Sequence, residues 1–273
     1  MGFARIDSEP ESYHAVNVNG GKNPEHPGDF LKKGKTGGIL AVGNTLYAWI
    51  NMQDGIWPNV DVELGWSKDE GATWNLSPWW FPKGTGNLKP GTFLNFGQGY
   101  IGVPSKLKGF VYFYATREGD ETKVYLCRAP EEELQDRTSY RYFTGLETGK
   151  PRWSKDDEKA KPVFQSSNDW DATVIYDPPL KRYLLTNFHT GPGQLGIFDG
   201  PEPWGPWTTV AYYDKWGNMG SEGEGLNCSF PQKWMSADGL TLWCVFSAYG
   251  PGAKEGVNAH DRFNLVKATL KLN

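Results

Sequence analysis

The segment Ser67–Trp74 constrains the fold more than any other part of the chain. It reads Ser-x-Asp-x-Gly-x-Thr-Trp, the pattern known as an Asp-box. With this spacing Asp69 can accept hydrogen bonds from backbone N–H groups of its own turn, and Gly71 can adopt a positive φ. Trp74 then re-enters a strand and buries a large ring. Such a turn joins two antiparallel strands and recurs from blade to blade in β-propellers. We therefore interpret Asp69 as structural and not catalytic.

A weaker copy of this motif lies near the other end of the chain, at Ser236–Trp243. Two turns of one type indicate a repeated architecture. Strand-like segments restart at residues 38, 91, 171 and 227, and most of these starts open a run of about four short strands. The predicted strands cover residues 3–6, 39–42, 45–50, 62–66, 74 onward, 92–95, 110–115, 123–128, 140–143, 172–176, 183–187, 195–198, 207–212, 229–234, 242–247 and 263–270. We interpret Glu131–Lys161 as a surface insertion with one helical turn at Pro130–Leu134.

The composition agrees with many short strands joined by tight turns. The 273 residues include 34 Gly, 19 Pro, 13 Trp, 13 Tyr and 14 Phe, which favours strands and turns over long helices. No linker divides the chain. We predict a single all-β domain over residues 1–273, a β-propeller of four-stranded blades with four complete blades visible.

Several classes of function are not expected. The net charge of −4 leaves no basic surface for nucleic acid, and no apolar run approaches the roughly 20 residues that span a membrane. The sequence shows no signal peptide, no nucleotide-binding loop and no metal-binding motif, so we predict neither cofactor nor metal. A turn centred on Asp238 and Gly239 would leave Cys228 and Cys244 out of register. We therefore expect three thiols and no disulfide.

Propeller topology predicts where a binding site lies. Connections alternate between the two faces, so the loops between second and third strands and between blades share the face opposite the Asp-box turn. These are residues 51–59, 117–121, 187–189, 248–261, 32–36, 83–89, 165–171 and 219–227.

The side chains of these loops suit a sugar. The predicted substrate-binding residues are Trp57, Asn59, Lys89, Arg117, Trp170 and Asn187, and the predicted catalytic residues are Asp171, Glu224 and His189. Tryptophan offers a flat apolar face, and the polar groups can bind hydroxyls or carboxylates. Glycoside hydrolysis needs two carboxyls across one bond, and Asp171 and Glu224 both come just before an inner strand.

Each of these residues also has a structural interpretation. A lone Trp can pack between blades, Asp171 and Glu224 can cap strand ends, and His189 can be an ordinary loop histidine. If the substrate were a uronic acid, a His189 base with Arg117 neutralising the carboxylate would suit β-elimination.

Several further stretches resemble one family. They are Gly91–Gly97, Asp199–Trp207 with its Pro-Trp-Gly-Pro-Trp sequence, Ser229–Gly239 and the Asp-box. They resemble a largely uncharacterised family of bacterial, often secreted β-propeller proteins that includes endo-D-arabinanases. The resemblance implies a five-bladed propeller and, for characterised members, hydrolysis of arabinan-type polysaccharide.

The resemblance also implies that an opening blade, which carries acidic residues thought to be catalytic, is missing here, because Gly2–Ile6 matches its end. The sequence thus predicts a glycoside hydrolase-like protein with an oligo- or polysaccharide partner. A glycan-binding or inactive propeller and a polysaccharide lyase remain as alternatives, and the oligomeric state is open.

Overall fold

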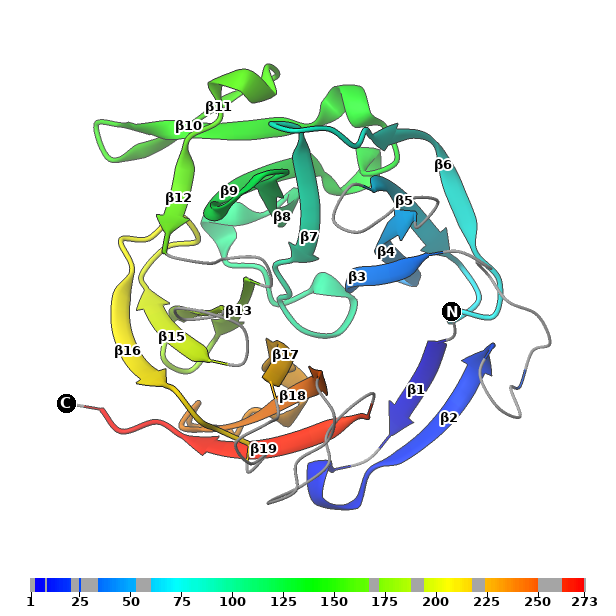
Figure 1. Ribbon diagram of the computed structural model, residues 1–273, viewed down its shortest axis with the longest axis vertical. Helices are drawn as coiled ribbons and strands as arrows, with labels where there is room; N and C mark the ends of the chain where they lie inside the picture. The colour runs from blue at the N-terminus through cyan, green and yellow to red at the C-terminus, as the bar shows by residue number, and fades with distance from the viewer. Residues whose placement is uncertain are drawn as a thin grey trace.

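The computed structural model describes residues 3–7, 9–20, 25, 34–52, 60–166, 172–187, 194–217, 224–249 and 262–272. These residues form a ring of antiparallel sheets, each with its first strand near the centre and its last strand at the periphery (Figure 1). The predicted all-β propeller is confirmed.

The ring contains four blades and one hairpin. The strands are β1 (Phe3–Asp7), β2 (His14–Asn19), β3 (Lys35–Val42), β4 (Thr45–Met52), β5 (Asp61–Ser67), β6 (Asn75–Phe81), β7 (Leu88–Phe93), β8 (Phe110–Arg117), β9 (Asp120–Pro130), β10 (Arg141–Glu147), β11 (Lys150–Ser154), β12 (Pro162–Gln165), β13 (Thr173–Asp177), β14 (Arg182–Asn187), β15 (Leu195–Gly200), β16 (Thr208–Tyr213), β17 (Glu224–Ser229), β18 (Thr241–Tyr249) and β19 (Asn264–Thr269). Blade 1 is β3-β4-β5-β6, blade 2 is β7-β8-β9-β10-β11 with β12 also paired to β9, blade 3 is β13-β14-β15-β16, and blade 4 is β17-β18-β19. The helices are single 3-10 turns: η1 (Pro10–Ser12), η2 (Gln98–Tyr100), η3 (Ser105–Leu107), η4 (Glu131–Glu133), η5 (Arg137–Ser139), η6 (Asp157–Lys159) and η7 (Gln232–Trp234).

Aromatic side chains fill the space between blades 1 and 2. Trp49 is completely buried, stacks on Phe93 at 5.0 Å between ring centroids and contacts Phe113 at 5.1 Å. The inner strands of these blades approach so closely that a Cβ at Gly38 would lie 2.7 Å from the Cα of Thr92. Glycine is therefore required there because a side chain would separate the two blades.

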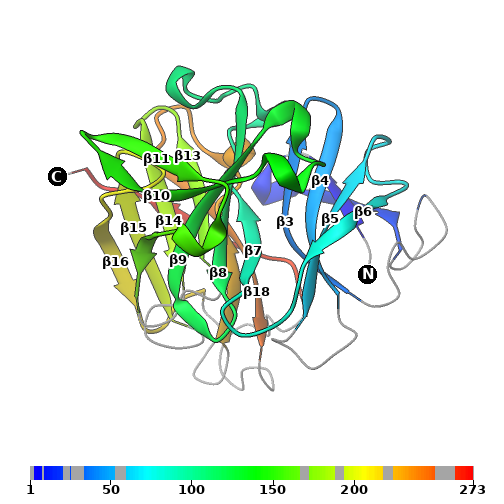
Figure 2. The ribbon, with the colours of Figure 1, turned by 90° about the horizontal axis from the view of Figure 1, so that it is seen from above.

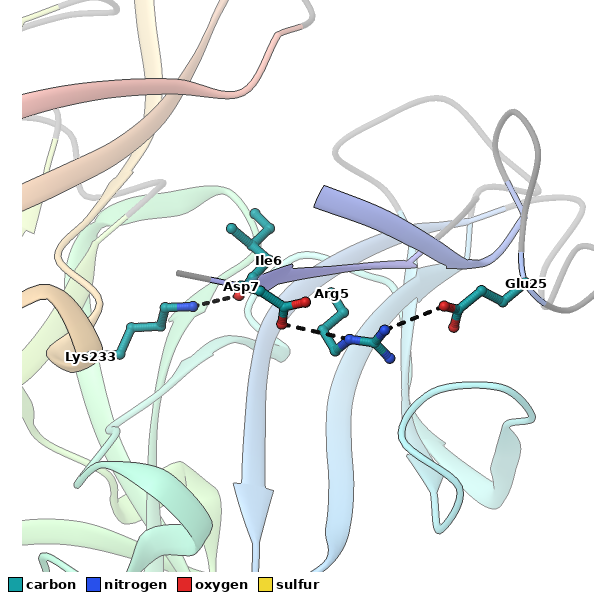
Figure 3. Close-up of polar contacts among 5 residues, drawn as sticks. All are labelled: Arg5, Ile6, Asp7, Glu25 and Lys233. Atoms are coloured by element: carbon teal, nitrogen blue, oxygen red, sulfur yellow. Dashed lines mark hydrogen bonds and ion pairs between the residues drawn. The ribbon is translucent and has the colours of Figure 1, made fainter. Parts of the chain in front are cut away.

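The β1–β2 hairpin lies between blades 4 and 1 and closes the ring (Figure 1). Toward blade 1, Phe3 stacks on Trp74 at 4.3 Å, and Asn19 donates a hydrogen bond to the Ala72 carbonyl. Toward blade 4, the Lys233 ammonium donates to the Ile6 carbonyl at 2.5 Å (Figure 3).

An ion-pair chain braces the same hairpin. Figure 3 shows Arg5 between Asp7, at 3.6 Å, and Glu25, at 3.3 Å. All three side chains are about half exposed, so the chain adds little stability, and the closure depends mainly on the ring and backbone contacts.

Three local predictions are wrong. The inner strand of blade 2 is Leu88–Phe93 and not residues 92–95, and that of blade 4 is Glu224–Ser229 and not residues 229–234. The predicted insertion is largely part of blade 2, because β10 pairs with both β9 and β11. The helical turn expected at Pro130–Leu134 is present as η4.

The prediction of no disulfide is also wrong. Cys228 and Cys244 are joined, with Cα atoms 6.0 Å apart. The connection from β17 to β18 includes the η7 turn, and the pairing register shifts between Leu226 and Ser229. Because of these two irregularities, the pairing of β17 with β18 cannot be counted from a simple hairpin turn at Asp238 and Gly239, and the two cysteines come close enough to bond. Cys127 is a buried thiol.

The strand directions give the propeller two distinct ends. At one end, which we call the site rim, the inner strand of each blade begins and the second strand finishes; these strands are β3 and β4, β7 and β8, β13 and β14, and β17 and β18. We call the opposite end the turn rim. It carries the connections β3–β4, β5–β6 and β13–β14 (Figure 2). No helix among the placed residues has the length and apolar character needed to cross a membrane.

Candidate functional site

Four of the predicted site residues belong to strands that end at the site rim. Lys89 lies near the start of β7, Arg117 and Asn187 end β8 and β14, and Glu224 begins β17. The remaining predictions lie outside the described residues: Trp57, Asn59, Trp170, Asp171 and His189.

Buried polar side chains gather at this rim. They are Lys89, Thr116, Glu118, Thr186 and Asn187, which come from blades 2 and 3. Burying polar groups costs free energy unless they are paired. Their presence at one end of the ring therefore marks a region where the fold buries polar groups despite the free energy that this requires.

Lys89 is the buried cation of this group. It pairs across the strands with Thr116, and its Nζ lies 3.9 Å from Oε1 of Glu121. Burial lowers the pKa of the Lys89 ammonium, and the nearby charges of Glu121 and Glu118 partly offset this effect. The ammonium is thus already balanced by acidic neighbours.

Glu118 and Glu121 are both used to fix the chain. Oε2 of Glu118 accepts a hydrogen bond from the Gly84 N–H at 3.1 Å, and Oε1 of Glu121 accepts one from the Gly119 N–H at 3.1 Å. These carboxylates hold the loop before β7 and the turn between β8 and β9 in place.

Arg117 braces the same loops. Its guanidinium donates to the carbonyls of Gly86, at 2.6 Å, and Asp157, at 2.5 Å, and lies 5.0 Å from the centroid of the Tyr125 ring. Two of its nitrogens are therefore occupied by backbone groups. This arrangement positions the rim and leaves the guanidinium poorly suited to clamp a substrate carboxylate.

The third blade contributes an amide and two hydroxyls. The Asn187 side-chain NH₂ donates to Oγ of Ser166 at 2.7 Å. Hydroxyls of Thr173 and Thr186 each lie 2.8 Å from the Cys228 carbonyl, so they connect blade 3 to the inner strand of blade 4. A Cβ at Gly196 would lie 2.5 Å from Oδ1 of Asn187, and glycine leaves the room that the amide needs.

The sequence analysis missed the threonines of this site. Thr116, Thr173 and Thr186 occur within β-strand patterns, where a β-branched residue is expected for its strand propensity alone. Only the positions of strand ends show that their hydroxyls lie at the rim, and no local sequence signal distinguishes them.

The turn rim holds carboxylates with different roles. Asp69 accepts bonds from the hydroxyl and N–H of Thr73 and from the Ser67 hydroxyl, which lower its pKa to about 2. Its carboxylate is committed to its own turn. The related turn in blade 4 repeats this pattern with Ser236 and Asp238.

Asp177 is different because it is completely buried between blades 3 and 4. Its Oδ1 accepts the Leu180 N–H, whereas its Oδ2 has no hydrogen-bond partner among the described residues. Burial, with Asp238 nearby, raises the pKa of this carboxyl. Within the described ranges no group of three or more His, Cys, Asp or Glu side chains could hold a metal ion.

Solved structures that are similar to this chain include three enzymes. A GH43_1 enzyme from Xanthomonas citri has 13% identity and a TM-score of 0.48, with coverage of 99% of this chain and 80% of that one. An α-L-arabinofuranosidase of family GH62 from Coprinopsis cinerea has 10% identity and a TM-score of 0.41, with coverage of 90% and 93%. The α-L-arabinofuranosidase Arb93A from Fusarium graminearum has 13% identity and a TM-score of 0.42, with coverage of 97% and 85%.

No curated protein matched the chain. The model of one protein family, described as "Domain of unknown function (DUF4185)", matches residues 38–232. This match covers the larger part of the sequence, and the protein belongs to that family.

Proposed function

We propose that this protein is a carbohydrate-active propeller that binds and hydrolyses a neutral, arabinan-type polysaccharide at the site rim. The observation that carries this proposal is the gathering of buried amide, hydroxyl and charged side chains at one end of the ring. Such groups pair with sugar hydroxyls, and a rigid scaffold holds them in place.

The charges of the rim favour a neutral sugar. Lys89 is balanced by Glu121, and the Arg117 guanidinium is bound to two backbone carbonyls. A uronic acid would need a cation that is available to its carboxylate. These contacts therefore weigh against the β-elimination of uronic polymers that His189 and Arg117 would perform.

Asp171 and Glu224 are the proposed catalytic carboxyls. Glu224 opens the inner strand of blade 4 at the site rim, and Asp171 precedes Ala172, whose carbonyl accepts the Thr92 hydroxyl of blade 2. Hydrolysis would use one carboxyl as the acid and the other as the nucleophile or base. Trp57, Trp170, Asn59 and Asn187 are proposed to bind the sugar.

The decisive experiment measures reducing ends released from soluble arabinans and other neutral glycans. We expect Glu224→Gln and Asp171→Asn each to reduce the rate about 10²-fold or more. The matched control is Glu132→Gln, an exposed position in η4 at the turn rim, which should keep full activity. Equal loss in all three variants, or no release from any glycan, would contradict hydrolysis.

Glycan binding without cleavage is the second candidate. It is favoured by Glu118 and Glu121, because these carboxylates of the rim accept backbone hydrogen bonds and support loops. Calorimetric binding of the same glycans with no turnover would support this function. An absorbance increase from unsaturated uronates would instead indicate the lyase.

A further inference from the structure

Two arginines are paired directly across neighbouring strands at the turn-rim end of blade 2. Arg128 lies near the end of β9, and its partner in the register is Arg141, the first residue of β10. Both residues are partly buried. Like charges directly opposite each other destabilise a sheet, so the fold accepts a repulsion here that needs a reason.

Aromatic rings hold the Arg128 guanidinium in place. Its Cζ lies 3.9 Å from the centroid of the Phe110 ring and 4.2 Å from that of Trp153. Trp153 contacts Phe143 at 5.8 Å between ring centroids, and Phe143 stacks on Trp204 of blade 3. Trp204 belongs to the Pro-Trp-Gly-Pro-Trp sequence, and this segment therefore supports the rings that position the guanidinium.

This group of side chains has donors and no anion. Among the described residues no carboxylate forms an ion pair with Arg128 or Arg141. Nε of Arg128 and Nε1 of Trp153 are buried there without a hydrogen-bond partner. Burial lowers the pKa of the Arg128 guanidinium, a hydrogen bond with the Tyr112 hydroxyl partly offsets this, and the Arg141 charge lowers it further. Burying a cation without a counter-charge is costly.

The carboxylates of the adjoining segments have other partners. Glu131 directly follows β9, and its Oε1 accepts the Gly109 N–H at 3.2 Å. Glu202 lies in the segment of Trp204, and its Oε1 pairs with the Lys106 ammonium. Neither carboxylate contributes to the pKa shift of Arg128, so the positive charge of the two arginines is not balanced by them.

Arg141 is anchored through one nitrogen. All of its hydrogen bonds to the described residues come from Nη1, which donates to the carbonyls of Thr138, Ser139 and Tyr140. The backbone thus fixes the side chain beside Arg128, and none of these bonds uses its Nε or Nη2.

We propose that Arg128 and Arg141 form a binding site for a phosphate group. Two guanidinium groups carry two positive charges, which match a phosphate of charge near −2 better than a single carboxylate. Their planar sets of N–H donors suit phosphate oxygens, and a bound phosphate would offset the repulsion between the two side chains. Because this site lies at the opposite end of the ring from Glu224, the proposal does not depend on hydrolysis at the site rim.

The test is isothermal titration calorimetry of the full chain with sodium phosphate at pH 7 and low ionic strength, since salt screens partly exposed charges. We expect one site on the wild type and a loss of affinity of about tenfold or more in Arg128→Gln and in Arg141→Gln. Arg128→Lys keeps the charge but not the planar donors, and it should also weaken binding. Glucose 6-phosphate separates two sources: binding at least as tight as that of free phosphate assigns the site to a phosphate ester, and weaker binding assigns it to the free ion.

The matched control is Arg152→Gln, which removes the same charge from an exposed position of β11 where the arginine pairs with Glu147. This variant should bind phosphate as the wild type does. Thermal unfolding identifies the variants that fold, and the two positions are tested separately so that either can decide. No binding of phosphate to the wild type, unchanged affinity in a folded Arg128→Gln or Arg141→Gln variant, or acetate that binds as tightly as phosphate would overturn the proposal.

Discussion

At the scale of single residues, the buried Asp177 makes one contribution to how the stability of the protein depends on pH. Its pKa is raised in the folded protein because burial disfavours the charge. The folded protein therefore holds the proton of Asp177 more tightly than the unfolded chain does. The resulting contribution to stability is fully present below the ordinary aspartate pKa, near pH 4. This contribution is lost as the pH rises through the folded-state value, when an uncompensated charge must be buried.

Replacement by a neutral isostere should remove this penalty. We expect Asp177→Asn to raise the free energy of unfolding by about 1 kcal/mol at pH 7 relative to the wild type. The two proteins should become similar near pH 3, because Asp177 is then protonated in both states. Urea denaturation across this pH range measures the difference, and a variant that is less stable at every pH would contradict the account.

Gly239 faces the same carboxylate, and a side chain there would meet two separate costs, a strained backbone and a collision. Its φ is +74°, and a Cβ would lie 2.4 Å from Oδ1 of Asp177. Gly109 has a φ of +85° with open space around it. We expect Gly109→Ala to cost about 1–2 kcal/mol for the left-handed backbone, and Gly239→Ala to cost about 1–3 kcal/mol more for the collision.

Thermal or urea unfolding of both variants measures these costs. Since Gly109 shares the backbone strain but not the collision, the difference between the two variants isolates the contact with Asp177. Equal costs would show that the carboxylate moves aside without penalty.

At the scale of elements, the first strand of blade 4 is held from both sides. The disulfide joins Cys228 to β18, and hydroxyls from β13 and β14 contact the Cys228 carbonyl. These contacts fix the strand that carries Glu224 at its start. The contacts that hold the strand of Glu224 in place are thus made at Cys228, four positions further along the chain.

Removal of the disulfide should destabilise the protein. We expect a Cys228→Ala and Cys244→Ala double variant to lose about 2–4 kcal/mol of unfolding free energy, because the unfolded chain regains a loop of 16 residues. Dithiothreitol should weaken the wild type to a similar extent and leave the double variant unchanged. A reductant effect that persists in the double variant would contradict this account, because the remaining Cys127 is already a thiol that dithiothreitol does not change.

The sequence predicted most strands but not all of their limits. Val62–Trp66 alternates clearly, residues 110–115 form a continuous run of apolar and aromatic side chains, and the structure has strands in both places. The inner strand of blade 4 was misplaced because its residues, Glu-Gly-Leu-Asn-Cys-Ser, have weak β-propensity, whereas residues 229–234 are more apolar. Contacts with two neighbouring strands outweigh local preference there, and sequence periodicity does not record such contacts.

The candidate site could be located only in part for a similar reason. Topology alone predicts which strand ends meet, and so Lys89, Arg117, Asn187 and Glu224 were assigned to one rim. The engagement of Arg117 with the carbonyls of Gly86 and Asp157 could not be predicted. It depends on residues 31 and 40 positions away in the chain, which no local pattern connects.

At the scale of the whole molecule, the ring is closed by the two-stranded hairpin. Its contacts with blade 1 centre on the stacked pair Phe3 and Trp74. We expect Phe3→Ala to lower the free energy of unfolding by about 1 kcal/mol, the value of an aromatic pair. It should also speed amide hydrogen exchange in β1 and β2 more than in blades 2 and 3.

Hydrogen exchange read by mass spectrometry separates these regions. Leu146→Ala is the control, because Leu146 is exposed on β10 away from the closure. Uniform acceleration around the ring in Phe3→Ala would mean that the hairpin is not a separate closing element.

Because strand directions alternate, the turns that stabilise the blades and the loops that carry the candidate site lie at opposite ends of the ring. Short turns such as Ser67–Trp74 and Ser236–Thr241 satisfy their own hydrogen bonds at one end of the ring. The connections at the site rim leave from the opposite ends of these strands. Loops of different length and chemistry could therefore be exchanged there without retuning the interior, which makes this molecule a natural acceptor for grafted specificity.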